Sequence, residues 1–194
     1  MSNYNYQTPQ NLATLSNVVY ECLCDAWQPT FSVLFPDSDD LTPVQTLLAD
    51  EDSEFAAGNI RILSDDDDIL GVTAVLPLSA LKSVRQKTLF KMIDMVDDKA
   101  AFMKNMTGYA QRFPTLPDED GVYLSKFAIA RTRRGKGLAD ILMQHFLDEY
   151  NQGMPYFLEV HQENAAAIAL YQKHGFAVAS AEDGKEYYLM KRNP

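Results

Sequence analysis

The fold is decided by the stretch Phe127-Ala-Ile-Ala-Arg-Thr-Arg-Arg-Gly-Lys-Gly-Leu-Ala139. Its apolar start predicts a strand over Val122–Ala130, and a basic turn with two glycines follows. Apolar residues at helical spacing then predict a helix over Gly137–Tyr150. Glycines allow the backbone to curl so that several N–H groups point into one concavity, and the first turn of a helix adds unpaired N–H donors. This strand, turn and helix therefore predict a binding site for phosphate groups.

Charge is distributed unevenly along the 194 residues, whose formal net charge is −10. Residues 1–120 hold 8 Lys and Arg against 19 Asp and Glu, whereas residues 121–194 hold 9 against 8. Five of these nine cations fall within 11 positions that contain no acid, namely Lys126, Arg131, Arg133, Arg134 and Lys136. One dense basic cluster in an acidic protein indicates one anionic ligand, whereas a nucleic acid requires a broader basic surface. We therefore expect Arg134 and Lys136 to add positive charge beside a pyrophosphate, and we expect no nucleic-acid partner.

A second informative stretch is Leu158-Glu-Val-His-Gln-Glu-Asn-Ala-Ala-Ala-Ile-Ala-Leu-Tyr-Gln-Lys-His-Gly-Phe176. It continues a strand predicted over Pro155–Val160 into a helix predicted over Asn164–Lys173. The side chain of Asn164 is of the type that caps a helix, and Tyr171 follows it by roughly two helical turns. Asn164 and Tyr171 are therefore expected on one face of this helix.

The remaining sequence patterns predict a mixed α/β sheet. In chain order they indicate a helix over Pro9–Ala26, a helix over 42–49, strands over Gly58–Ser64 and Ile69–Leu76, a helical segment over 79–112, and final strands over Phe176–Ala179 and Glu186–Lys191. The first two strands are joined by a short polar run and form an antiparallel hairpin, while the later β-α-β order gives a parallel pair near the centre of the sheet. The length suits a single domain over 1–194, in which 79–112 is a helical insertion.

Composition excludes several classes of protein and of site. No run approaches the ~20 apolar residues of a membrane-spanning helix, and the first residues lack the pattern of a secretory signal. Cys22 and Cys24 are too close together for a useful disulfide and lack a second Cys or His pair for zinc. The acidic run 65–68 lacks the glycine and the downstream Glu of a calcium loop. We expect a cytoplasmic protein with reduced thiols, no metal and no membrane partner.

The two informative stretches together resemble the GNAT superfamily of N-acetyltransferases. Arg134-Gly-Lys-Gly-Leu-Ala139 looks like the superfamily's Arg/Gln-x-x-Gly-x-Gly/Ala pyrophosphate motif. Asn164-x-x-Ala-Ile-x-Leu-Tyr171-x-Lys-x-Gly-Phe176 looks like the motif that follows it, and the resemblance covers Val122–Lys191. It implies the acyl-coenzyme A N-acyltransferase fold, which is a central, mostly antiparallel sheet containing one parallel pair and flanked by helices. It also implies acetyl-coenzyme A (acetyl-CoA) as cosubstrate and an amine as acceptor.

The resemblance implies a role for each residue of the two motifs. The strand edge Phe127–Ile129, with Ala128 at its centre, lies beside the pantetheine arm. A backbone N–H of Phe127 or Ile129 polarises the thioester carbonyl, which is typically worth about 3 kcal/mol per donor. The pyrophosphate is held by backbone groups of Arg134, Gly135, Lys136, Gly137, Leu138 and Ala139. Asn164 hydrogen-bonds the pantetheine, and Tyr171 is the general acid for the leaving thiolate.

The acceptor side of the site is less sharply defined by the sequence. The general base is Glu159, His161, Tyr123 or a water molecule, and alternation puts Glu159 and His161 on one face of their strand. Segment 79–112 is expected to build one wall of the acceptor site. The acceptor is expected to be a small amine or a peptide amine. If the acids of 118–120 rim that site, they favour a cationic amine such as a polyamine, an aminoglycoside or a lysine side chain.

Two other functions stay open on sequence grounds. One is a non-catalytic acyl-CoA sensor or interaction module on the same fold, and the other is an unrelated anion-binding α/β protein. Tyr171 and the complete turn over 134–139 favour an enzyme. We expect the amine to attack acetyl-CoA directly in a ternary complex, because neither cysteine lies in the motif region as a covalent carrier. The protein is expected to be a monomer or a homodimer.

Overall fold

One mixed sheet organises the chain, and the computed structural model describes residues 4–9, 15–35, 41–66, 68–151 and 153–194. The sheet has seven strands in the order β1-β2-β3-β4-β5-β7-β6. The strands are β1 (Tyr4–Gln7), β2 (Ile60–Asp65), β3 (Asp68–Pro77), β4 (Val122–Ile129), β5 (Tyr156–His161), β6 (Ala177–Ser180) and β7 (Tyr187–Arg192). All neighbouring strands are antiparallel except β4 and β5, which are parallel. The predicted mixed class, the hairpin and the single parallel pair are confirmed.

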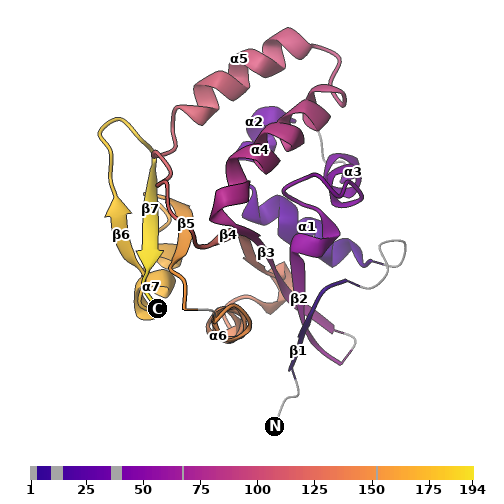
Figure 1. The fold of residues 1–194 in the computed structure, drawn as a ribbon. Helices are drawn as coiled ribbons and strands as arrows, with labels where there is room; N and C mark the ends of the chain where they lie inside the picture. The colour runs from indigo at the N-terminus through magenta and orange to yellow at the C-terminus, as the bar shows by residue number, and fades with distance from the viewer. Residues whose placement is uncertain (1–3, 10–14, 36–40, 67, 152) are drawn as a thin grey trace.

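Helices flank both faces of this sheet (Figure 1). They are α1 (Asn17–Ala26), α2 (Thr30–Leu34), α3 (Thr42–Leu48), α4 (Leu78–Ile93), α5 (Lys99–Ala110), α6 (Leu138–Glu149) and α7 (Ala165–Lys173), with two 3-10 turns, η2 (Ala57–Asn59) and η3 (Arg131–Arg133). The helices predicted from 42–49, 79–112 and the two informative stretches are therefore confirmed. None of the helices in the described parts of the chain combines the length and the apolar character needed to cross a bilayer.

The N-terminal region differs from the prediction. The helix expected from Pro9 begins only at Asn17, because the side chain of Ser16 accepts a hydrogen bond from the Val18 N–H at 3.3 Å and caps the helix. Residues 10–14, which include part of that predicted helix, and Asp67 of the acidic run lie outside the described residues. Strand β1 and helix α2 were not predicted, since 4 and 5 residues are too short to show a clear periodicity.

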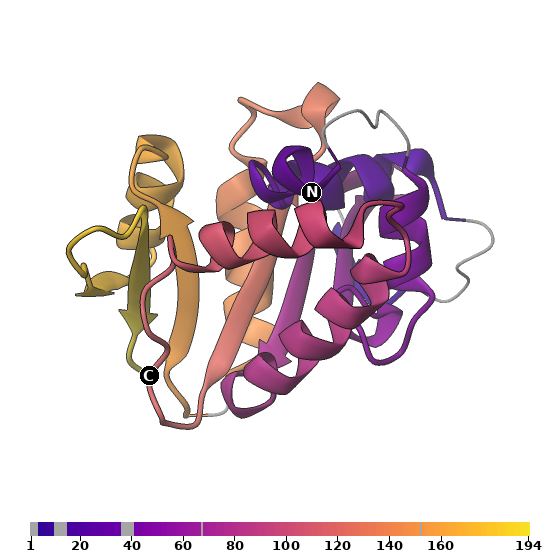
Figure 2. The same ribbon diagram turned by 90° about the horizontal axis from the view of Figure 1, so that it is seen from above.

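The two faces of the sheet carry separate cores because side chains alternate along each strand. Val72, Ala74 and Ala128 point to the face covered by α1 and its neighbours. Leu63 and Ile129 point to the opposite face, where they pack with residues of α6. Figure 2 shows α4 and α5 lying across the first of these faces. The predicted insertion therefore covers the side of the sheet that α6 does not cover.

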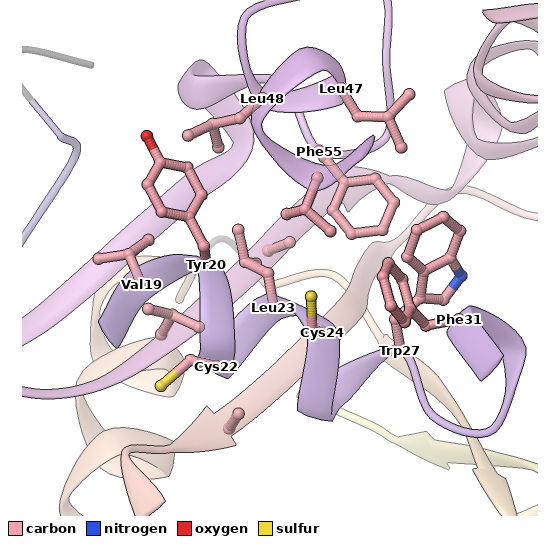
Figure 3. Packing of buried hydrophobic residues seen from close by; sticks show 14 of the residues in the cluster. Val19, Tyr20, Cys22, Leu23, Cys24, Trp27, Phe31, Leu47, Leu48 and Phe55 are labelled. Carbon is pink, nitrogen blue, oxygen red and sulfur yellow. The ribbon is translucent and has the colours of Figure 1, made fainter. Parts of the chain in front are cut away.

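Aromatic rings fill the core beneath α1 and α2 (Figure 3). The ring centroid of Trp27 lies 4.6 Å from that of Phe55 and 5.8 Å from that of Phe31. Cys22 and Cys24 are buried, unpaired thiols in the same region. Burial raises the pKa of Cys22 to about 12 and that of Cys24 to about 11, so both thiols stay protonated at neutral pH.

Strands β4 and β5 separate partway along their length. Their register contains only the pairs Val122↔Tyr156 and Tyr123↔Phe157, although both strands continue beyond these residues. On its other edge β4 contains a bulge, because Ala74 pairs with Lys126 and Val75 with Leu124. Ser125 is the extra residue of this bulge, and bulges commonly re-aim side chains next to active sites.

Gly71 provides a test of the packing between β3 and β4. A Cβ atom at Gly71 would lie 2.7 Å from the Ala128 carbonyl oxygen, whereas a Cβ atom at Gly58 would meet nothing within 4 Å. We expect Gly71→Ala to lower the free energy of unfolding by about 1–3 kcal/mol, because backbone must shift to make room. Urea denaturation of Gly71→Ala and of the control Gly58→Ala measures the difference. Equal stability of the two variants would show that the β3–β4 contact is looser than described.

Candidate active site

A cavity of about 670 Å³ lies between β4, the start of α6 and the helix α7. Of the residues predicted to bind the cofactor, those that line it are Phe127, Ala128, Ile129, Arg134, Gly135, Gly137, Leu138, Ala139, Asn164 and Tyr171. Lys136 does not line this cavity, and its side chain is exposed to solvent. The tertiary structure thus brings the two motifs together around one space, and we call this space the cofactor cavity.

The turn between β4 and α6 has the geometry of an anion site. Gly135 and Gly137 have φ angles of 74° and 75°, in the left-handed region that glycine adopts without steric cost. Gly137 is the N-cap residue of α6 and supplies no side chain to bond the first N–H groups of this helix. The positive end of the helix dipole adds to these donors. The backbone of this turn can therefore hold a phosphate group.

The basic cluster around this turn is largely neutralised by acids that are distant in the sequence. Asp25 on α1 accepts hydrogen bonds from both Arg131 and Arg134, and Arg133 pairs with Asp68 at 2.5 Å. Hydrogen bonds from Arg131 lower the pKa of the Asp25 carboxyl, and Arg134 adds to this effect. Arg134 also donates through Nε to the Ile129 carbonyl oxygen at 3.0 Å. Acids that are absent from these 11 positions of the sequence therefore lie beside the cluster in the folded chain.

Lys126, the fifth cation of that cluster, lies away from the turn. Its ammonium group is buried and bonds Glu54 at 2.9 Å and Ser125 at 2.7 Å. Burial lowers the pKa of Lys126 below its usual value, and the charge of Glu54 opposes this effect. Burial would raise the pKa of Glu54, but Lys126 and Arg85 lower it to about 2. Glu54 is therefore an ionised carboxylate at neutral pH.

Helix α7 positions both of the residues predicted on it. The side-chain oxygen of Asn164 accepts a hydrogen bond from the Ala167 N–H at 3.1 Å, so Asn164 caps the helix as expected. Tyr171 is 8% exposed, and its ring meets that of Phe127 edge-on with centroids 6.2 Å apart. Burial raises the pKa of the Tyr171 hydroxyl above its usual value. This hydroxyl forms no hydrogen bond with the described residues and stays protonated at neutral pH.

A cluster of three charged or titratable side chains ties α6 to α7. Asp140, in the first turn of α6, lies 2.9 Å from His174 and 2.7 Å from Lys173. The side chain of His174 is only 13% exposed. The sequence shows no partner for His174, because the two helices meet only in the folded chain. This contact fixes the distance between the two helices that border the cofactor cavity.

A second cavity, of about 1130 Å³, lies on the α4 and α5 side of β4. Its walls come from α4, the end of α5 and the segment 113–120 that follows α5. Segment 79–112 therefore builds one wall of this cavity, as the sequence analysis expected for the acceptor site. We call it the acceptor cavity. The two cavities share five lining residues, which are Ala26, Gln28, Ser125, Glu159 and Tyr187.

Glu159 is the most distinctive residue of the junction between the cavities. Its side chain is 3% exposed, and its Oε2 accepts hydrogen bonds from Tyr123 at 2.6 Å and from Arg85 at 2.7 Å. Its Oε1 is buried and has no hydrogen-bond partner among the described residues. Buried carboxylate oxygens are rarely left unpaired, because the desolvation cost is high. Oε1 is thus placed to accept a proton or a hydrogen bond from a ligand.

The other two predicted bases are less suitably placed. Tyr123 donates its proton to Glu159, and burial raises its pKa well above the usual value. His161 lines the cofactor cavity but not the acceptor cavity. Its Nδ1 accepts a hydrogen bond from the Glu163 N–H at 3.3 Å. Among Glu159, Tyr123 and His161, the geometry favours Glu159 as the candidate general base.

Several functional residues were missed by sequence reasoning. Glu54 and Arg85 meet Lys126 and Glu159 across sequence separations of 72 and 74 residues, and Asp25 meets Arg134 across 109. No local pattern marks such partners, since nothing in the neighbouring sequence distinguishes these charged residues from those at the surface. Within the described parts of the chain no group of three or more His, Cys, Asp or Glu side chains is arranged to hold a metal ion.

Comparisons with known proteins give the family and the fold of the chain. The profile of the Acetyltransferase (GNAT) family matches residues 18–176. Among solved structures, an N-acetyltransferase from Staphylococcus aureus Mu50 covers 96% of this chain and 98% of its own, with a TM-score of 0.64 and 16% identity. A histone acetyltransferase HPA2-related protein from Corynebacterium glutamicum covers 100% and 97%, with a TM-score of 0.62 and 21% identity.

A third similar structure is the NatC complex bound to Gag peptide and CoA, with 98% of both chains covered, a TM-score of 0.51 and 13% identity. At these identities the structural likeness shows the fold alone. No curated protein matches the sequence. The family profile spans most of the chain, including both motifs that border the cofactor cavity. The chain therefore belongs to the GNAT acetyltransferase family.

Proposed function

We propose that this protein transfers the acetyl group of acetyl-CoA to a primary amine within a ternary complex. The observation that carries the proposal is the junction of two cavities at Ser125 and Glu159, where a buried carboxylate oxygen has no partner. A sensor of acyl-CoA needs only one cavity and has no use for a buried base beside it. A junction of this kind instead suits two substrates that react with one another.

We further propose that residues 1–194 form one catalytic domain. The sheet runs from β1 near the start of the chain to β7 near its end, so elements from both ends share one hydrogen-bonded unit. The helical insertion 79–112 supplies the acceptor wall and the Arg85 side chain that bonds Glu159.

Acetyl-CoA would occupy the cofactor cavity. Its pyrophosphate would lie on the backbone N–H groups of 134–139, and its pantetheine along Phe127–Ile129 and beside Asn164. A bound pyrophosphate would compete with Asp25 for the Arg134 guanidinium, which lies at the cavity wall. The CoA bound to the NatC neighbour supports this choice of ligand.

The reaction can be written with all protons accounted for. Oε1 of Glu159 takes a proton from the bound ammonium group, and the neutral nitrogen then forms a bond to the thioester carbonyl carbon. The second proton that this nitrogen loses passes to solvent. A backbone N–H of Phe127 or Ile129 stabilises the oxyanion that develops. The C–S bond then breaks, and the Tyr171 hydroxyl gives its proton to the leaving thiolate. Exchange with solvent restores both residues after the products leave.

Replacement of Gly137 tests the cofactor site. We expect Gly137→Val to weaken acetyl-CoA binding by about tenfold or more, because a β-branched residue resists the left-handed backbone and covers the N–H donors. Calorimetric titration with acetyl-CoA, dephospho-CoA, ATP and NAD measures affinity and selectivity. Gly184→Val is the control, because Gly184 has a similar φ of 77° and equally open surroundings but lies outside the cavity. Equal affinity for ATP and acetyl-CoA in the unaltered protein would remove the proposal.

Replacement of Tyr171 separates catalysis from binding. We expect Tyr171→Phe to keep its affinity for acetyl-CoA and to lose about 10²–10⁴-fold in kcat, since only the proton donor is removed. Tyr188→Phe is the matched control, because Tyr188 lies outside both cavities. Unchanged turnover in Tyr171→Phe would assign the proton transfer to another group.

Replacement of Glu159 tests the base. We expect Glu159→Gln to lower kcat/KM about 10²–10⁴-fold while acetyl-CoA affinity stays the same. The remaining activity should rise with pH until the amine itself is neutral, because the variant depends on amine that has already lost its proton. The pH–rate profile of Glu159→Gln beside that of His161→Asn shows which residue acts. A larger loss in His161→Asn would transfer the role to His161.

A further inference from the structure

We infer that the preferred acceptor is an aliphatic polyamine whose reacting amine lies at Glu159 and whose second ammonium group lies at Asp118 and Asp120. This inference rests on the proposed function, because it takes Glu159 as the residue that faces the reacting nitrogen. It adds a second, separate point of recognition at the outer end of the acceptor cavity.

The charges that line the acceptor cavity favour a ligand with more than one positive charge. Five carboxylates line it, those of Glu54, Asp118, Glu119, Asp120 and Glu159. Three cations line it, those of Lys82, Arg85 and Lys126. The lining therefore has a formal net charge of −2. A cavity of one net sign concentrates ligands of the opposite sign.

The acids are divided between the two ends of the cavity. At the inner end, Glu54 pairs with Lys126 while Glu159 pairs with Arg85, and only the Oε1 atom of Glu159 has no partner. At the outer end, Lys191 neutralises Glu119 at 2.9 Å. Asp118 and Asp120 are exposed and have no ion-pair partner in the part of the chain that the structure describes.

Lys82 is the one cation that opposes these outer acids. It is exposed on α4 and forms no ion pair with another described residue. Because Lys82 carries one positive charge, Asp118, Asp120 and Lys82 together have a net charge of −1. The mouth of the cavity therefore remains negative even when Lys82 is counted, and one additional ammonium group would balance it.

The spacing between the two ends sets the length of the ligand. Asp120 stands two residues before β4, and Ser125 lies at the junction with the cofactor cavity. At about 3.3 Å per residue, an extended backbone separates the two by roughly 16 Å. Side chains that point into the cavity shorten the gap between charges. A short diamine would not span it, whereas a longer polyamine would.

Apolar side chains also line this cavity. They include Leu78, Leu116 and Phe113, together with Leu89, Met92 and Met106 of the α4 and α5 wall. Methylene groups between two ammonium groups can pack on such a surface, while each charged end meets a carboxylate. A rigid, strongly hydrated amine such as an amino sugar lacks this apolar segment.

Two amines that differ only in a second ammonium group test the inference. At low ionic strength we expect kcat/KM for octamethylenediamine to exceed that for octylamine by about tenfold, because the extra charge lies at Asp118 and Asp120. The advantage should shrink at high salt, and tetramethylenediamine should gain little over butylamine because it is too short. Equal kcat/KM for octamethylenediamine and octylamine would overturn the inference and leave the proposed acetyl transfer intact.

The double variant Asp118→Asn with Asp120→Asn localises the effect. It should lower kcat/KM for octamethylenediamine more than kcat/KM for octylamine, so that the preference for octamethylenediamine disappears. The matched control is Asp97→Asn with Asp183→Asn, which changes the net charge equally at exposed positions outside the cavity. The control should keep the preference. A preference that survives in the first variant, or disappears in both, would overturn the proposed location.

Binding can also be measured without turnover. Trp27 is the one tryptophan of the chain and lines the acceptor cavity, so its fluorescence reports on a ligand bound there. Titration with each amine in the presence of CoA, followed by Trp27 fluorescence, gives the two dissociation constants. Tighter binding of octamethylenediamine that depends on Asp118 and Asp120, with no acetyl transfer to any amine, would support a polyamine-binding site but refute the proposed function and, with it, the acceptor role of the polyamine. Equal dissociation constants would refute the inference alone.

Discussion

The separation of β4 from β5 is the constraint on which the rest of the site depends. The two strands pair only at Val122↔Tyr156 and Tyr123↔Phe157, and then diverge while each stays in the sheet through its other neighbour. Strand edges that lose a neighbour expose N–H and C=O groups that need new partners. An extended amide-containing ligand such as pantetheine can supply them. The same opening lets a cavity on the α6 and α7 side meet a cavity on the α4 and α5 side at Ser125.

A four-charge network keeps that opening in a defined shape. Glu54 and Arg85 come from elements outside the central strands, whereas Lys126 and Glu159 come from β4 and β5. Their charges balance, and the loss of any one would leave the network with one uncompensated charge, which is costly where the groups are buried. Such a network is a poor source of stability but a strong determinant of geometry. Through this network, Arg85 of the helical insertion 79–112 orients the carboxylate of Glu159, which is proposed as the base. The insertion does so without contacting the glycine turn over 134–139.

The cofactor side uses a related arrangement at the surface. Asp25, near the end of α1, holds Arg131 and Arg134 beside the glycine turn, while Asp140 connects α6 to His174 of α7. Helix α1 continues into Trp27 and Gln28, both of which line the acceptor cavity. The same helix end therefore borders both cavities. A shift of Asp25 would therefore change the positions of Arg131 and Arg134. It would also change the end of α1 that lines the acceptor cavity.

The sequence by itself determined most of the helices and strands and the glycine turn over 134–139, because the signals for them are local. Glycine at positive φ, the Asn164 cap and helical spacing of apolar residues act within a few neighbouring residues. The short β1 and α2 lacked enough residues for such signals, and Ser16 moved the start of the first helix. Only the tertiary structure decided which acids neutralise the basic cluster and which oxygen stays unpaired. Those facts depend on residues separated by 36 to 109 positions, and the chain brings them together only when its two faces pack on one sheet.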